Sequence, residues 1–167
     1  MRLLILLVII LVVGLITGCY SSNEDRAIIL NSEVLTTEKT LPSNFYEIAD
    51  QGVFVTKVTN QKEFIKQSDM FGVTVVPSEI NWNNQVVFFV GMIESGTCPL
   101  ELDAIGINSD KTEMIIHLKV ESEDKPCTDD ATPRTKVIAV DAEEVSDVTV
   151  IKIDNLFGIS PLVELAK

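Results

Sequence analysis

Residues 85–93 read Gln-Val-Val-Phe-Phe-Val-Gly-Met-Ile, the most apolar run of the chain beyond its first 18 residues. A short run rich in β-branched and aromatic residues favours a strand over a helix. Side chains alternate between the two faces of a strand, and here both alternating sets are apolar. We therefore predict a central strand that is buried on both faces.

Two further strands are expected after this run. Residues 100–107 alternate apolar with acidic side chains, and residues 113–121 alternate more regularly. In the second stretch the even positions from Met114 to Val120 are apolar, whereas His117 falls on the opposite, polar face. The two stretches are predicted to form a hairpin.

Before the central run, residues 52–59 (Gly-Val-Phe-Val-Thr-Lys-Val-Thr) predict another strand. Asn60 is then expected to cap a short helix, with Glu63 completing a capping box, and the helix should end near Gly72. Further short strands are expected at residues 73–76, 135–141 and 148–154.

Six or seven short strands with one short helix predict a mainly β fold. The expected architecture is a small antiparallel β-sandwich or an open barrel. It should form a single β-rich domain over residues 45–167.

The first 18 residues hold 14 apolar side chains. As a helix, residues 3–16 would span about 21 Å, short of the ~30 Å hydrocarbon core of a bilayer. A signal-peptide apolar segment is therefore favoured over a membrane-spanning helix. An uncleaved anchor, or an ordinary signal peptide in which Cys19 is incidental, is the alternative.

The run ends in Ile16-Thr17-Gly18-Cys19. This sequence resembles the lipobox of bacterial lipoproteins, in which an aliphatic residue and two small residues precede a cysteine. The resemblance implies a diacylglyceryl thioether on Cys19, cleavage before it, and location on the outer face of the cell membrane. Two acyl chains suffice for stable anchoring. One departure from the pattern is a basic start with a single arginine, Arg2.

Residues 19–44 predict a lipidated, flexible tether, because most of them are polar. The exception is residues 27–30 (Ala-Ile-Ile-Leu), which could add an edge strand to the domain.

The chain carries 13 basic and 25 acidic side chains, for a net charge of −12. So acidic a protein repels phosphate backbones, which makes nucleic acid an improbable partner.

Cys98 and Cys127 are an even pair in a chain expected to be exported, which favours a disulfide. Cys98 precedes the first strand of the predicted hairpin and Cys127 follows the second, so both should emerge at the same end. The rival hypothesis is a reactive thiol with His117 as its base. The position of His117 on a polar strand face argues against it.

No further reaction centre stands out. Acidic residues crowd the loop around Cys127, but the spaced ligands and central glycine of a calcium loop are absent. One histidine and two bridged cysteines cannot supply a zinc site. Trp82, the single tryptophan, is interpreted as a plug over the core rather than a ligand platform. We expect no cofactor, metal or catalytic residue.

The order of elements offers a second resemblance. A helix at 60–70 is followed by residues 79–82 (Glu-Ile-Asn-Trp), the central run, a Ser-Gly turn at 95–96, two alternating strands and residues 132–140. This order is similar to the PrcB C-terminal-like domain of exported bacterial proteins, some linked to extracellular protease complexes. The likeness covers about residues 50–142.

The chain departs from that family by carrying Cys98 and Cys127, and by having Asn81 where an acidic residue is expected. The resemblance implies a non-catalytic, protein-binding or stabilising role, and it transfers no functional residue. Our expectation is a lipid-anchored module that binds an extracytoplasmic protein or envelope component. The alternatives are a solute- or metal-ion-binding lipoprotein and an envelope hydrolase.

Overall fold

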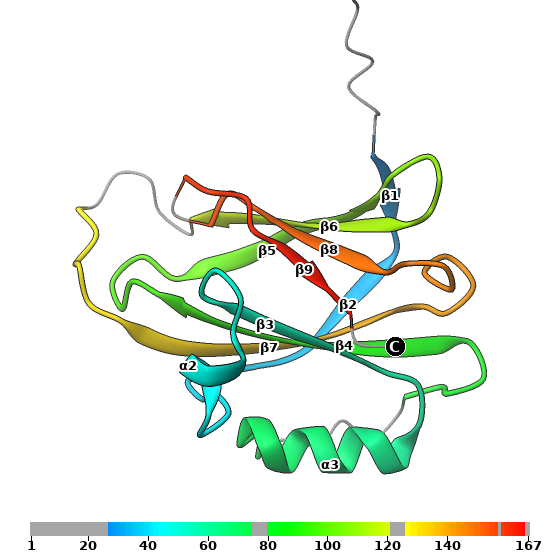
Figure 1. The fold of residues 1–167 in the computed structure, drawn as a ribbon, viewed down its shortest axis with the longest axis horizontal. Coiled ribbons are helices and arrows are strands. Elements are labelled where there is room, and N and C mark those ends of the chain that lie inside the picture. Colours follow the sequence, from blue (N-terminus) through cyan, green and yellow to red (C-terminus); the bar gives the residue numbers. More distant parts are fainter. Residues whose placement is uncertain (1–26, 75–79, 121–125, 157, 166–167) are drawn as a thin grey trace, which may run out of the picture.

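The computed structural model describes residues 27–74, 80–120, 126–156 and 158–165. Two sheets face each other, and a helix covers the outer side of one of them (Figure 1). The fold is thus a small β-sandwich without barrel closure, which confirms the predicted class.

The first sheet has the strand order β1-β5-β6-β8-β9. All neighbours in it are antiparallel except β6 and β8, which run parallel. Its strands are β1 (Ile28–Leu30), β5 (Leu100–Ile107), β6 (Glu113–Val120), β8 (Val150–Asp154) and β9 (Leu162–Glu164).

The second sheet is antiparallel throughout, with the order β2-β7-β4-β3. Its strands are β2 (Ser32–Glu38), β7 (Thr132–Asp141), β4 (Gln85–Glu94) and β3 (Val53–Val58). Helix α2 (Phe45–Ile48) lies between β2 and β3 in the chain, and helix α3 (Gln61–Phe71) lies between β3 and β4.

Strand β4 is central and buried on both faces, as predicted. Phe88 and Val90 belong to the core between the sheets, whereas Val87 and Phe89 face the cluster under α3. Gly91 lies on the α3 side, where a Cβ would come within 2.9 Å of the Leu41 side chain. The absence of a side chain at Gly91 therefore lets the segment that contains Leu41 pack directly on the sheet.

Helix α3 begins and ends where the sequence predicts. The Asn60 side chain accepts a hydrogen bond from the Glu63 amide at 3.0 Å, and the Glu63 carboxylate accepts one from the Thr59 amide at 3.2 Å. Gly72 adopts the left-handed conformation that ends the helix, with φ at 67°. Trp82 packs edge-on against Phe64, with ring centroids 5.9 Å apart, which confirms its role as a plug over this cluster.

The predicted flexible tether is wrong for residues 32–38, and the edge strand that the sequence left open at residues 27–30 is present at residues 28–30. Residues 32–38 continue as β2 on the other sheet. The polar sequence of β2 obscured this, because β2 is an edge strand without a buried residue, whose stability comes from its pairing with β7. The domain therefore begins well before residue 45.

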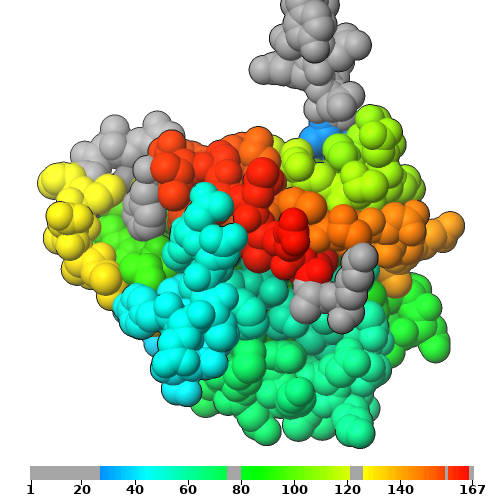
Figure 2. Space-filling model, in the orientation of Figure 1, coloured from blue at the N-terminus to red at the C-terminus, as the bar shows by residue number. Residues whose placement is uncertain are grey.

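Smaller differences concern short elements. Helix α2 and strand β9 were not predicted. Val73 and Thr74, predicted as the start of a strand, lie outside any strand, and the rest of that range lies outside the described residues. On the face shown in Figure 2, the segment that contains α2 (cyan) lies beside the segment that contains β9 (red), and the two line a shared hollow.

Candidate functional site

A disulfide and a cluster of hydrogen-bonded polar groups lie at one end of the sandwich. Cys98 and Cys127 form a disulfide there, with 5.3 Å between their Cα atoms. Cys98 precedes β5 and Cys127 follows β6, and β5 and β6 pair as an antiparallel hairpin. The structure thus confirms the predicted bridge and its position at one end of that hairpin.

Asp130 ties the loop after Cys127 to the loop before Cys98. Its carboxylate accepts hydrogen bonds from the Gly96 amide at 3.1 Å, from the Thr132 hydroxyl at 2.9 Å, and from the Thr128 hydroxyl. These bonds, with that of Thr128 first, hold the pKa of Asp130 below its usual value. A Cβ on Gly96 would collide with the carboxylate, so the glycine is required for this approach.

A buried ion pair lies just inside this end. The Glu94 side chain is fully buried, and its Oε1 accepts a hydrogen bond from Nε of Arg134 at 2.5 Å and forms an ion pair with Nη2 of the same guanidinium, also at 2.5 Å. Its Oε2 accepts a bond from the Leu100 amide at 3.0 Å. Glu94 therefore links β4 and β7 of one sheet to the start of β5 in the other.

Lys136 lies two residues along β7 from Arg134 and points to the same face of the sheet. It is 4% exposed. Burial lowers the pKa of Lys136, and the charges of Glu94 and Glu101 act in the opposite direction. No hydrogen bond or ion pair joins its ammonium to any part of the chain that the structure describes.

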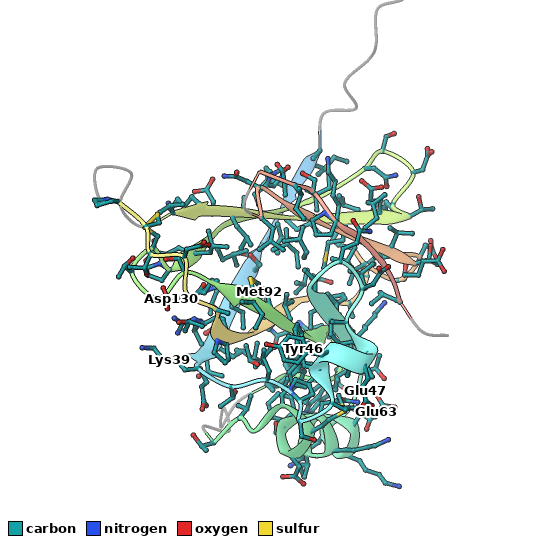
Figure 3. The ribbon with its side chains drawn as sticks, turned by 60° about the vertical axis from the view of Figure 1, so that its left-hand side comes forward. Lys39, Tyr46, Glu47, Glu63, Met92 and Asp130 are labelled. Atoms are coloured by element: carbon teal, nitrogen blue, oxygen red, sulfur yellow. A yellow bond between two sulfur atoms is a disulfide. The ribbon has the colours of Figure 1, made fainter. Side chains whose placement is uncertain are left out.

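Two hollows flank these groups. One, of about 580 Å³, lies between the disulfide and the fully buried Glu94. The other, of about 590 Å³, is an open groove between β2 and β5 that we call the basic groove. It is lined by three cations, one carboxylate and apolar side chains, among them Lys39, Arg134, Lys136, Glu101, Val34 and Leu102. Lys39 and Asp130 lie at the same end of the sandwich (Figure 3).

The structure does not assemble the reactive-thiol alternative. Both cysteines are bonded to each other. His117 is on the outward face of β6, and its Nδ1 lies 3.1 Å from Oδ2 of Asp154. Asp154 also accepts a bond from the Ser160 hydroxyl at 2.9 Å, and these bonds, with that of Ser160 first, lower the pKa of Asp154.

The described residues do not assemble a metal site either. No group of three or more histidine, cysteine, aspartate or glutamate side chains is placed to hold an ion within that part of the chain. Of the acidic loop, Glu121, Glu123 and Asp124 lie outside the described residues.

The predicted lipid anchor, Cys19, also lies outside the described residues. Within the ranges that are described, no helix is long and apolar enough to cross a bilayer.

Sequence reasoning found the disulfide but missed Glu94, Arg134, Lys136 and Asp130. One signal was present: Glu94 ends the most apolar run of the domain, where a carboxylate needs a partner if it is buried.

No protein-family model, curated protein or solved structure matches the chain. The resemblance to the PrcB C-terminal-like domain therefore stays a prediction.

Proposed function

We propose that this protein is a bacterial lipoprotein held on the outer face of the cell membrane by a diacylated Cys19. The observation that carries the proposal is the Ile16-Thr17-Gly18-Cys19 sequence at the end of the N-terminal apolar run. The Cys98–Cys127 disulfide supports it, because such bonds persist in oxidising compartments and are rare in the cytosol.

On this proposal the sandwich is a non-catalytic module that binds a protein or an envelope component. Support comes from how its polar groups are used. The carboxylates of Glu94 and Asp130 are occupied by structural hydrogen bonds, and His117 is paired with Asp154. The end of the sandwich near the disulfide instead offers open hollows suited to recognition.

Metabolic labelling with radioactive palmitate tests the anchor. The wild-type chain is expected to take up label, and Cys19→Ala is expected to lose both the label and membrane fractionation. The matched control is the double variant Cys98→Ala, Cys127→Ala, which should stay labelled. An unlabelled wild-type protein, or a labelled Cys19→Ala protein, would overturn the proposal.

The binding role is tested by crosslinking in intact cells followed by affinity purification. A reproducible partner, enriched over the same experiment with an unrelated lipoprotein, is the expected result. A rise in melting temperature of several degrees with calcium or a transition metal would favour the ion-binding alternative instead.

A further inference from the structure

The basic groove is unusual for this chain because it gathers cations in a protein of net charge −12. Lys39, Arg134 and Lys136 line it, against a single carboxylate, Glu101. Arg134 is already neutralised by the buried Glu94. The remaining positive charge comes from the two lysines, of which Lys39 is exposed at the rim and Lys136 is buried.

Lys136 is the central observation. Charged side chains with so little exposure are almost always paired, because an unpaired buried charge is costly. The other lysine whose pKa burial lowers, Lys57, meets this rule: its ammonium donates to the Val145 carbonyl at 2.6 Å. Lys136 has no such acceptor among the described residues, yet its ammonium is not one of their fully buried polar atoms without a partner, because it reaches the open groove. Water solvates the ammonium there, and a carboxylate arriving from outside would replace that water and pair with the charge.

The strands that line the groove indicate the shape of the ligand that would bind there. Strand β1 pairs with β5 only at Ile105–Ile107, so residues 100–104 have no strand beside them on that side among the described residues. Across the groove, β2 is the outermost strand of its sheet. The groove therefore runs between two open strand edges, which are the surfaces to which extended peptides add.

We propose that the basic groove binds an extended acidic segment of a partner protein, with one carboxylate of that segment on Lys136. Lys39 at the rim attracts further acidic residues, and the apolar side chains of Val34 and Leu102 contact the residues between them. This inference rests on the proposed binding function and supplies the chemistry of the partner. The acidic surface elsewhere does not prevent it, because charges beyond about 8–10 Å are largely screened at physiological salt.

The test is fluorescence anisotropy with the full, disulfide-bonded chain in detergent micelles. The probe is a short fluorescein-labelled peptide of alternating valine and glutamate, amidated at its carboxyl end. The matched probe replaces glutamate by glutamine. We expect the glutamate peptide to bind at least tenfold more tightly, with an affinity that falls as salt is raised.

Lys136→Met keeps the length of the side chain and removes its charge, so it should weaken binding of the glutamate peptide at least tenfold. Lys39→Met, at an exposed position that poses no risk to folding, should weaken binding less. Lys62→Met, on the exposed side of α3, is the control and should bind as wild type does. Far-UV circular dichroism confirms that each variant is folded.

Three results would overturn the inference: equal binding of the two peptides, unchanged binding by both groove variants, or no binding. Competition by inorganic phosphate at concentrations where acetate is inert would assign the groove to phosphate groups, and would also overturn it. Cellular crosslinking separates this failure from that of the proposed function. A partner captured in cells without peptide binding removes only the groove assignment.

Discussion

At the scale of single residues, the fully buried Glu94 holds two sheets together through Arg134 and the Leu100 amide. Glu94→Gln leaves Arg134, whose side chain is only 12% exposed, without its counter-charge, and breaking a buried pair in this way typically costs 3–5 kcal/mol. We expect the free energy of unfolding, measured by urea denaturation, to fall by about 3 kcal/mol.

The control for that prediction is the exposed pair between Lys111 and Glu144, whose atoms lie 2.9 Å apart. Glu144→Gln should change stability little, because exposed ion pairs contribute little. The double variant Glu94→Met, Arg134→Met should recover most of the loss, since it leaves no unpaired charge. A Glu94→Gln protein as stable as wild type would show that the pair does not brace the sandwich.

The hydrogen bonds of Asp130 predict how the stability of the fold changes at acidic pH. Its pKa is lower in the folded chain than its ordinary value of 3.8, so its hydrogen bonds stabilise the fold above about pH 4. That contribution is lost as the pH falls through the folded pKa. Asp130→Asn should therefore melt at a lower temperature than wild type at pH 7, and the two melting temperatures should approach each other as the pH falls below about 4.

Asp129→Asn, at the exposed neighbouring position, is the matched control and should follow the wild type across the same range. A difference between wild type and Asp130→Asn that stays constant from pH 7 to pH 3 would contradict the assignment.

At the scale of elements, local sequence was sufficient to predict those strands and helices that are determined by burial or by capping residues. The apolar run at 85–93 predicts β4, and the alternation at 113–121 predicts β6. Asn60 and Gly72 predict the two ends of α3. Strand β2 was missed because its exposed edge position leaves polar residues in it. Its strand character comes from pairing with β7, about 100 residues later in the chain, which no local pattern records.

The candidate site divides in the same way. The disulfide could be predicted because only two cysteines remain after Cys19 and the hairpin brings them to one end. The meeting of Glu94 with Arg134 depends on the register of β4 against β7, where Met92 faces Arg134 and Glu94 faces Thr132. Such long-range register cannot be read from one sequence, so the buried pair and the lysine beside it emerged only from the structure.

The hairpin itself carries the next prediction. The disulfide closes a loop over a sequence separation of 29 residues around β5 and β6. In the chain-entropy description, loss of such a link costs about 3.5 kcal/mol. Cys98→Ala with Cys127→Ala should lower the free energy of unfolding in urea by up to that amount. Wild type in dithiothreitol should behave like the double variant, and a wild type insensitive to dithiothreitol would contradict the prediction.

At the scale of the whole molecule, the position of β1 and β2 decides where the domain begins. The chain passes from one sheet to the other between Leu30 and Ser32, so β1 and β2 are the edge strands on the same side of the two sheets. Strand β2 pairs with β7 along Ser32–Glu38 and covers what would otherwise be an open edge. The folded module is therefore larger than the 45–167 domain predicted from sequence.

This boundary can be tested with two shortened chains. A chain that starts at residue 27 keeps both strands and should unfold cooperatively in urea. A chain that starts at residue 45 leaves β7 with an unpaired edge and exposes part of the core around Ile138, which pairs with Val34. It should aggregate or lack a cooperative transition, because an open apolar strand edge recruits other chains. A chain that starts at residue 32 loses only β1 and should fold with reduced stability. If the chain from residue 45 instead unfolds at the same urea concentration as the chain from residue 27, residues 27–44 are a tether after all and the pairing of β2 with β7 contributes nothing to the fold.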